Sequence, residues 1–256
     1  TYKDFEVIIV DDCSTDNSYM QLKDYANSSD LNIVLCKTEQ NVGPGKARNL
    51  GMDSASGEWL TFIDNDDWVS YDFLEKVDNV LKENDVNCVI YDYYIQKDNE
   101  RSVARSMYEG SNGPVAIADC MKYVRNHTFC KVYKLANCRE KNICFPHIRR
   151  CEDVAFVARA IEACGSAYYL AEPMYYYYQR SASLSNNKKL DESEMIQAFS
   201  ILESELGEKY PKELQEKSVT DLLYGVLLMM CKAGKSSKEI KQYIELYEKR
   251  YSNWEQ

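Results

Sequence analysis

The chain has 256 residues, enough for one large domain or for one domain with an appendage. Its formal net charge of −10 argues against a nucleic-acid-binding protein, because such proteins usually present a basic surface. No apolar run reaches the roughly 18 residues of a membrane-spanning helix, and the ten cysteines form no CxxC pair, which favours free thiols in a reducing cytoplasm.

The first part of the chain alternates short apolar runs with segments of helical character. Strands are expected at 5–10, 31–36, 59–63 and 87–93. Helices are expected at 46–55 and 71–84, and a further helix should begin within 14–18 and end at about residue 26. This alternation predicts an α/β fold with a mainly parallel sheet flanked by helices. Ligands of such sheets bind beyond the carboxyl ends of the strands, where Asp11-Asp12 and Asp64 to Asp67 both fall.

After about residue 96 the alternation weakens. A loop or short hairpin is expected at 97–114, helices at 116–125 and 152–163, and extended segments at 128–133 and 167–178. From Leu190 the chain reads as helical, with a break near Ser236. Apolar residues recur there at helical spacing and favour core packing over a homodimer face or a membrane-docking surface. They are Leu222, Leu223, Val226, Leu227 and Met230.

The most informative polar stretch is Asp64-Asn65-Asp66-Asp67, at the end of an apolar strand. Its three carboxylates repel one another unless a cation lies between them. Oxygen ligands suit hard ions such as Mg²⁺ or Mn²⁺. The other interpretation is a solvated turn in which Asp67 caps the next helix. The stretch by itself favours neither.

Two earlier groups could bind parts of a nucleotide. A carboxylate of Asp11-Asp12 could accept a hydrogen bond from a nucleobase or a ribose, although capping of the next helix by Asp12 or Ser14 is the favoured interpretation. The segment 41–48 combines a glycine loop, two cations and a helix start, features that attract phosphate.

A later acidic pair, Glu152-Asp153, opens a helix after Arg149-Arg150. Acids near a positive helix terminus are stabilising in any protein, and this is the first interpretation of the pair. The second interpretation is a general base.

In this order, five motifs resemble those of family 2 glycosyltransferases, the first of them strongly. They are F-E-V-I-I-V-D-D-C-S-T-D-N-S at 5–18, N-V-G-P-G-K-A-R-N-L-G at 41–51, A-S-G-E-W-L-T-F-I-D-N-D-D-W at 55–68, C-E-D-V-A-F at 151–156 and Y-Y-Y-Y-Q-R-S-A-S-L-S at 175–185. The resemblance covers residues 1–186. It implies a GT-A fold, a Rossmann-like sheet with a nucleotide-binding half at 1–96 and an acceptor half at 97–186. Residues 187–256 would form a helical C-terminal appendage.

The resemblance also implies roles in binding the donor. Asp12 would contact the nucleobase with Asp11 beside it, and three residues of the second motif would lie near the nucleotide and its phosphates. These three are Asn41, Lys46 and Arg48.

The later motifs imply the metal ligands and the catalytic groups. Asp64 and Asp66 match the DXD acids, with Asp66 as the direct ligand of Mn²⁺ or Mg²⁺, and Asn65 would lie near the ribose. Asp153 matches the catalytic base, and Glu152 would be its neighbour near the acceptor. Arg180, or Gln179 beside it, falls in the region that closes over the diphosphate.

These roles imply an inverting transfer of a sugar from a nucleotide-diphosphate donor, by default a UDP-sugar, to a hydroxyl of a glycan or lipid-linked acceptor. The expected setting is polysaccharide assembly in the cytoplasm, with peripheral association at the inner face of the membrane. Two alternatives stay open: a non-catalytic nucleotide-sugar-binding member of the same fold, and a sugar nucleotidyltransferase. The second would need a glycine-rich signature at its first strand.

The chain departs from the family at its start. Members normally begin with a strand such as V-S-V-I-I-P-x-Y-N and a helix, whereas this sequence begins at Thr1, after the position of that helix. Loss of that central strand would expose apolar surface and unpaired backbone groups on its neighbours. We therefore expect that the native protein carries an upstream segment.

Overall fold

The structure is a computed structural model that describes residues 2–179 and 192–251. Helices and strands alternate through its first part, and the described residues after 191 are helical. The strands are β1 (Glu6–Asp11), β2 (Asn32–Lys37), β3 (Trp59–Thr61), β4 (Trp68–Val69), β5 (Cys88–Lys97), β6 (Glu100–Ala104), β7 (Gly113–Val115), β8 (Lys131–Lys134) and β9 (Ala167–Tyr178). The helices are α1 (Ser18–Ser28), α2 (Pro44–Ser54), α3 (Phe73–Glu83), α4 (Ile117–Tyr123), α5 (Leu135–Glu140), α6 (Glu152–Cys164), α7 (Glu192–Leu206), α8 (Pro211–Ser218), the π-helical segment η2 (Val219–Gly225), α9 (Val226–Lys232) and α10 (Ser237–Arg250).

The strands form two sheets. β1 and β2 pair in parallel, and a seven-stranded sheet has the order β3-β8-β5-β9-β4, with β6 beside β5 and β7 beside β9. The expected α/β class is confirmed, but the expected mainly parallel sheet is corrected to a mixed one. β8 is antiparallel to both β3 and β5, while β9 is parallel to β5. β3, β5 and β9 therefore run in one direction, with β8 inserted against them from a later part of the chain.

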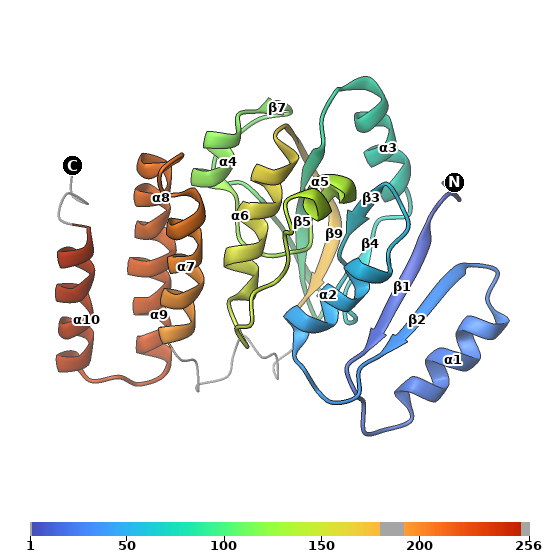
Figure 1. The fold of residues 1–256 in the computed structure, drawn as a ribbon, viewed down its shortest axis with the longest axis horizontal. Helices are drawn as coiled ribbons and strands as arrows, with labels where there is room; N and C mark the ends of the chain where they lie inside the picture. Colours follow the sequence, from blue (N-terminus) through green and yellow to red (C-terminus); the bar gives the residue numbers. More distant parts are fainter. Residues whose placement is uncertain (1, 180–191, 252–256) are drawn as a thin grey trace.

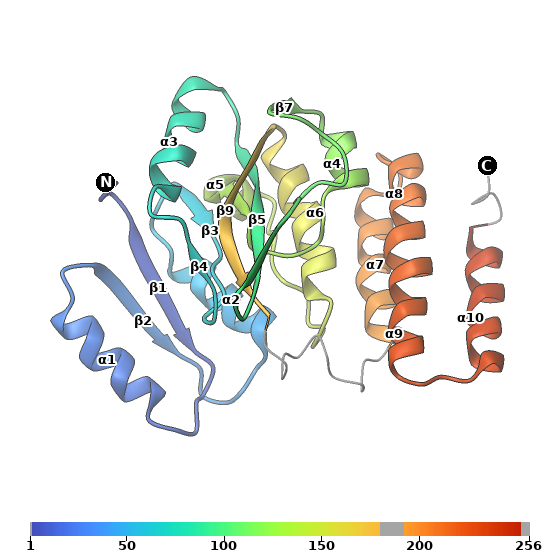
Figure 2. The same cartoon turned by 180° about the vertical axis from the view of Figure 1, so that it is seen from behind.

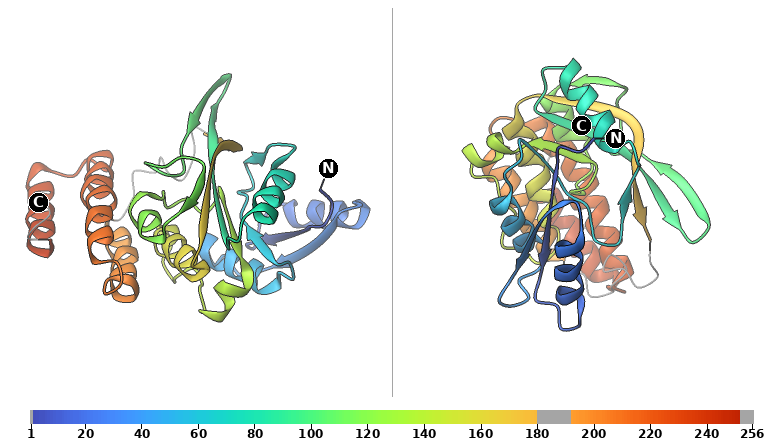
Figure 3. Two further views of the ribbon diagram at one scale, coloured as in Figure 1. Left: turned by 90° about the horizontal axis from the view of Figure 1, so that it is seen from above. Right: turned by 90° about the vertical axis from the view of Figure 1, so that its right-hand side faces the viewer.

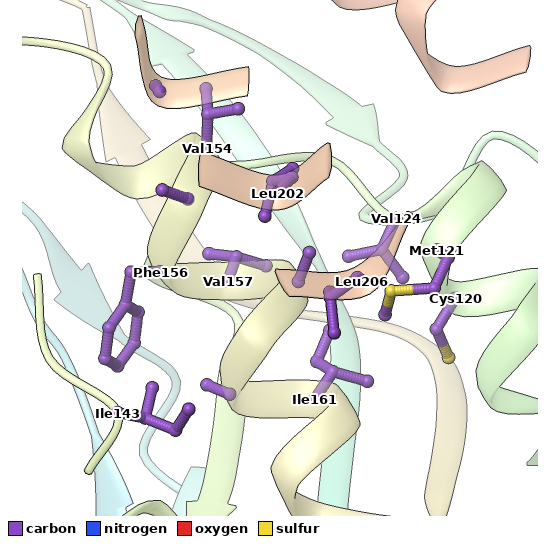
Figure 4. Packing of buried hydrophobic residues seen from close by; sticks show 14 of the residues in the cluster. Cys120, Met121, Val124, Ile143, Val154, Phe156, Val157, Ile161, Leu202 and Leu206 are labelled. Atoms are coloured by element: carbon purple, nitrogen blue, oxygen red, sulfur yellow. The ribbon is translucent and has the colours of Figure 1, made fainter. Parts of the chain in front are cut away.

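Helix α6 is the centre of the larger core. Eleven of its residues are buried, as expected of a helix that is covered on all sides. Figure 4 shows Val157 and Ile161 of this helix beside Leu202 and Leu206 of α7, with Cys120 and Met121 of α4 close by. A smaller core lies beneath α3, where Phe73 and Val77 pack with β5 and β9.

The C-terminal helices lie on one side of the central sheet, opposite β1, α1 and β2 (Figures 1 and 2). Their apolar residues join the larger core: Leu222, Val226 and Met230 are buried, and Leu223 and Leu227 pack against them. The core-packing interpretation of this region is thus confirmed. The domain boundary near residue 186 stays a prediction.

The N-terminal pair of strands is less buried than the rest. Along β1 only Asp11 is buried, and the apolar side chains of β1 and β2 are half-buried. Glu6 ties β1 to the turn before β3, because its carboxylate accepts hydrogen bonds from the backbone N–H groups of Ser56 and Gly57 at 2.7 and 2.8 Å. No helix in the described part of the chain is long and apolar enough to cross a bilayer.

Candidate active site

Arg48, in the middle of α2, joins the two halves of the fold. Its Nη2 donates to Oδ1 of Asp64 at 3.0 Å and its Nη1 donates to Oε1 of Glu152 at 2.8 Å. The guanidinium also lies over the ring of Phe145. The carboxylates around Arg48 raise its pKa although burial opposes this. Arg48 is therefore a fixed positive charge between the end of β3 and the start of α6.

The loop from Asp64 to Asp67 is held by β9. The Asp64 N–H donates to Oη of Tyr175 at 3.1 Å, and that hydroxyl donates to Oδ2 of Asp67 at 2.6 Å. Oδ1 of Asp67 accepts from the N–H of Tyr178 at 2.8 Å. Burial, opposed by these two hydrogen bonds, raises the pKa of Asp67 to about 6. The interpretation of Asp67 as a helix cap was wrong, because α3 begins only after Asp72.

The acidic pair Glu152-Asp153 lies in the first turn of α6. Glu152 is buried against Arg48, and Asp153 beside it is half-buried. Desolvation, and next the charge of Glu152, raise the pKa of Asp153 to about 7, although Arg48 opposes the shift. A carboxyl with a pKa near neutrality is suited to take up a proton at physiological pH. The preceding Cys151 adopts a left-handed conformation at φ 60°, which turns the chain into the helix.

Asp12 organises the loop that leads into α2. Its Oδ1 accepts from the N–H of Val42 at 2.8 Å and from the hydroxyl of Thr38 at 2.9 Å, and its Oδ2 accepts from the N–H of Gly43 at 2.8 Å. Asn41 donates back to the Asp12 carbonyl. The capping alternatives for Asp12 and Ser14 were wrong, since the N-cap of α1 is Asn17. The loop conformation follows from these contacts.

Asp11 is buried at the end of β1. Its carboxylate accepts from the N–H of Ser14 and lies 3.8 Å from the ammonium of Lys37. Asp11 is therefore engaged with the loop that follows β1, and Asp12 with the loop that leads into α2. The predicted contacts of Asp11 and Asp12 with a nucleotide stay predictions.

Close packing holds α2 against the segment before α6. A Cβ atom added at Gly45 would lie 3.1 Å from Cγ of Glu152 and 3.2 Å from Cβ of Phe145. Asn49 exchanges two hydrogen bonds with the backbone of Phe145, at 2.8 and 3.0 Å. The N-terminal ends of α2 and α6 lie at the end of the sheet where β9 finishes (Figure 1). Glycine at position 45 thus allows the acidic pair to approach α2.

The acids at the end of β3 are suited to a hard cation that is shared with a ligand. In residues 2–179 and 192–251, no three acidic, histidine or cysteine side chains converge as a complete metal site. Mg²⁺ and Mn²⁺ often take one or two protein carboxylates and complete their shells with substrate phosphates and water. Asp66, with Asp64 beside it, supplies oxygens of that kind. The metal therefore stays a prediction that these residues fit.

The remaining predicted residues are placed as follows. Lys46 is half-exposed on α2, and Asn65 is exposed in the acidic loop. Arg180 lies outside the described residues. The structure thus brings together Arg48, Asp64, Glu152 and Asp153, and it places Asp66 next to Asp67 in the same loop.

Two contributors went unrecognised in the sequence. Tyr175 was predicted only as part of the extended segment 167–178, and its hydroxyl in fact holds the acidic loop. Asn49 lies inside the second motif, where a polar residue one turn beyond Gly45 was the available signal. Neither role could be read without knowing which segments pack together.

Comparisons with known proteins agree with this arrangement. A family model described as Glycosyl transferase family 2 matches residues 1–144, more than half of the chain. The poly(ribitol-phosphate) beta-N-acetylglucosaminyltransferase TarS of Staphylococcus aureus is 27% identical over 220 residues, 82% of this chain and 37% of that protein. A poly(ribitol-phosphate) beta-glucosyltransferase of Bacillus spizizenii is 32% identical over 176 residues, 68% of this chain and 27% of that protein.

Among solved structures, S. aureus TarS 1-349 in complex with UDP-GlcNAc superposes with a TM-score of 0.71. The two are 24% identical, and the match covers 86% of this chain and 64% of that chain. This likeness confirms the expected GT-A fold. The chain spans 27% and 37% of the length of the two curated relatives described above.

Proposed function

This chain belongs to glycosyl transferase family 2, and on that premise we propose that it is a glycosyltransferase that inverts the anomeric configuration of the sugar it transfers. The donor would be a nucleotide-diphosphate sugar, with a UDP-sugar as the first candidate. The acceptor would be a hydroxyl of a glycan or of a lipid-linked saccharide. Association with a membrane surface and a homodimer through the C-terminal helices stay predictions.

One observation carries the proposal. Arg48 binds Asp64 from the end of β3 and Glu152 from the start of α6, beside a carboxyl whose pKa is about 7. A fixed cation, a group of acids at a strand end and a proton acceptor are what transfer from a diphosphate leaving group requires. An ion pair with a purely structural role would not need a neighbouring carboxyl, here that of Asp153, with a pKa near neutrality.

Each residue then has a defined task. Asp153 accepts the proton of the acceptor hydroxyl as its oxygen attacks the anomeric carbon from the face opposite the leaving group. Arg48 and Lys46 supply positive charge toward the diphosphate that leaves. When bound by Asp66 and Asp64, Mn²⁺ or Mg²⁺ would neutralise further charge on the diphosphate. Asp67, held by Tyr175 and Tyr178, keeps the acidic loop in place.

The printed names of the relatives suggest substrates to test. Two of them are transferases named for poly(ribitol-phosphate), and the solved relative holds UDP-GlcNAc. UDP-GlcNAc and UDP-glucose are therefore the first donors to screen. The non-catalytic alternative is disfavoured by the intact acids at 64, 66 and 153. The nucleotidyltransferase alternative has no feature of the site in its favour.

The first test is calorimetric titration of UDP into the protein with and without Mn²⁺, beside the variant Asp66→Ala. We expect binding that is tight only when both Mn²⁺ and Asp66 are present. Asp98→Ala, in the turn between β5 and β6, is a control that should bind as the wild type does. The absence of UDP binding by the well-folded wild type would refute a UDP-sugar donor. Binding without transfer to any acceptor would favour the non-catalytic alternative.

A further inference from the structure

A row of aromatic side chains crosses three strands next to the acidic loop. In the register of the sheet, Tyr94 of β5 faces Tyr176 of β9, and Tyr176 faces Trp68 of β4. Directly opposed residues project from the same face of a sheet. The row is thus built by strand pairing, and its members come from three distant parts of the chain.

The rings of this row stand nearly parallel. The centroids of Tyr94 and Tyr176 are 4.9 Å apart at an interplanar angle of 25°, and those of Tyr176 and Trp68 are 5.3 Å apart at 9°. The guanidinium of Arg101, on β6, lies 5.3 Å from the Tyr94 ring and 4.8 Å from the Tyr176 ring. The cation and the stacking make the row stiff. β5 and β6 form a hairpin that projects from the body of the molecule (Figure 3).

Trp68 ends the row at the edge of the sheet. Its strand β4 pairs with β9 and is the last in the strand order. One face of the indole is stacked on Tyr176, yet the residue is 43% exposed. No strand of the described sheet therefore flanks the indole on the side away from Tyr176. An aromatic ring that is held by stacking and partly open to solvent offers a flat apolar contact surface to a ligand.

The row is fixed to the candidate active site. Trp68 directly follows Asp67, and Tyr176 lies between Tyr175 and Tyr178, whose hydroxyl and N–H hold the Asp67 carboxylate. Side chains of β9 alternate between faces, so Tyr175 stacks with Phe129 on one side while Tyr176 stacks with Trp68 on the other. A molecule on the outer face of Trp68 would therefore lie beside the acidic loop.

We propose that Trp68, supported by Tyr176, Tyr94 and Arg101, is a platform for a pyranose ring of the acceptor. The ring of a β-glucoside carries axial C–H groups on both faces and equatorial hydroxyls at its rim, so it matches a flat indole face. An open-chain polyol phosphate has no such face. This inference rests on the proposed function, and it selects a saccharide ring over a polyol phosphate as the acceptor unit next to the site.

The test uses saturation-transfer NMR with methyl β-glucoside as the ring probe and ribitol 5-phosphate as the open-chain probe. We expect transfer to the axial ring protons of the glucoside in the wild type and in Trp68→Phe, and a signal about fivefold weaker in Trp68→Ala. The matched control is Tyr71→Ala, which removes an aromatic residue that is 94% exposed and lies outside the row. Equal signals from the wild type and Trp68→Ala, or equal signals from both probes, would overturn the proposal.

A second measurement needs no destabilising variant. Titration of methyl β-glucoside should shift the indole N–H resonance of Trp68, assigned through Trp68→Phe, and leave that of Trp59 in β3 unchanged. If neither resonance shifts, the result contradicts the proposed platform. UDP titration separates the two proposals: a wild type that binds the glucoside at Trp68 but never binds UDP keeps the platform and removes the UDP-sugar donor. Normal UDP binding with no glucoside contact does the reverse.

Discussion

Arg48 and Glu152 lie 104 positions apart in the sequence, and their side chains meet at 2.8 Å. This contact joins α2, which follows the glycine loop that is predicted to lie near the phosphates, to α6, which carries the predicted base. The same guanidinium reaches Asp64 at the end of β3. The geometry of the candidate site therefore depends on one cation more than on any single acid.

Replacement of Arg48 tests this dependence. Arg48→Met leaves the buried Glu152 without its partner, which should lower the free energy of unfolding by about 3 kcal/mol in urea denaturation. Arg48→Lys should recover only part of this loss, because an ammonium does not reach both carboxylates in fork geometry. Lys46→Met, on the same helix, should change stability by less than about 0.5 kcal/mol. Similar losses in both Met variants would argue against a special role for Arg48.

Asp153 should determine the acid limb of the pH profile. A general base works in its ionised form, so kcat/KM should fall as the pH drops below about 7, the pKa of this carboxyl. In Arg48→Lys the acid limb should stay near pH 7, whereas in Arg48→Met it should move to higher pH, because Arg48 lowers the pKa of Asp153.

Asp153→Asn should slow transfer by about 10²- to 10⁴-fold without weakening UDP binding. Asp119→Asn, in the first turn of α4, is the control. An acid limb near pH 4 would exclude Asp153 as the base.

The same carboxyl should cost stability at neutral pH. Folding raises the pKa of Asp153 from 3.8 to about 7, so the native state holds the proton more tightly than the unfolded state does. Stability due to this group is therefore present below about pH 4 and is lost as the pH rises to about 7. Asp153→Asn should raise the melting temperature relative to the wild type at pH 8 and have little effect at pH 4. An unchanged difference between the two pH values would contradict the raised pKa.

Tyr175→Phe tests the support of the acidic loop. The hydroxyl accepts from the Asp64 N–H and donates to Asp67, so its removal should cost about 1 to 2 kcal/mol in the free energy of unfolding. It should also weaken Mn²⁺-dependent UDP binding, because the loop loses its anchor to β9. Tyr177→Phe, on the same strand, is the control and should stay within about 0.5 kcal/mol of the wild type. UDP binding that is unaffected in Tyr175→Phe would make the anchor irrelevant to the ligand.

Two glycines of α2 should respond oppositely to alanine. Alanine usually stabilises a helix by up to about 1 kcal/mol relative to glycine. At Gly51 the new Cβ would meet Val10 at 3.4 Å, an ordinary contact, so Gly51→Ala should keep much of this gain. At Gly45 it would crowd Glu152 and Phe145, so Gly45→Ala should lower the melting temperature and disturb activity. A stabilised, fully active Gly45→Ala would show that the acidic pair can shift without consequence.

Much of the local structure was predictable. The expected strand at 167–178 coincides with β9 (Ala167–Tyr178), and the helix expected from Glu152 begins there as α6. Boundaries in the middle of the chain were less accurate: the segment 128–133 became β8 (Lys131–Lys134). The prediction of a mainly parallel sheet was also wrong in part. Strand β8 pairs between β3 and β5, and the periodicity of a sequence does not show which strands pair.

The sequence by itself determined the family, the positions of most strands and helices, and the acids at the strand ends. These properties depend on residue type and on neighbours within a few positions, which determine periodicity, turns and motifs. Only the tertiary structure decided that Arg48 binds both Asp64 and Glu152, that Tyr175 holds Asp67, and that Trp68 completes an aromatic row. Apart from the contact between Arg48 and Asp64, those contacts join segments far apart in the sequence, as between Arg48 and Glu152, 104 positions apart. The burial and the neighbouring charges that set the pKa of Asp153 also exist only once the chain has packed.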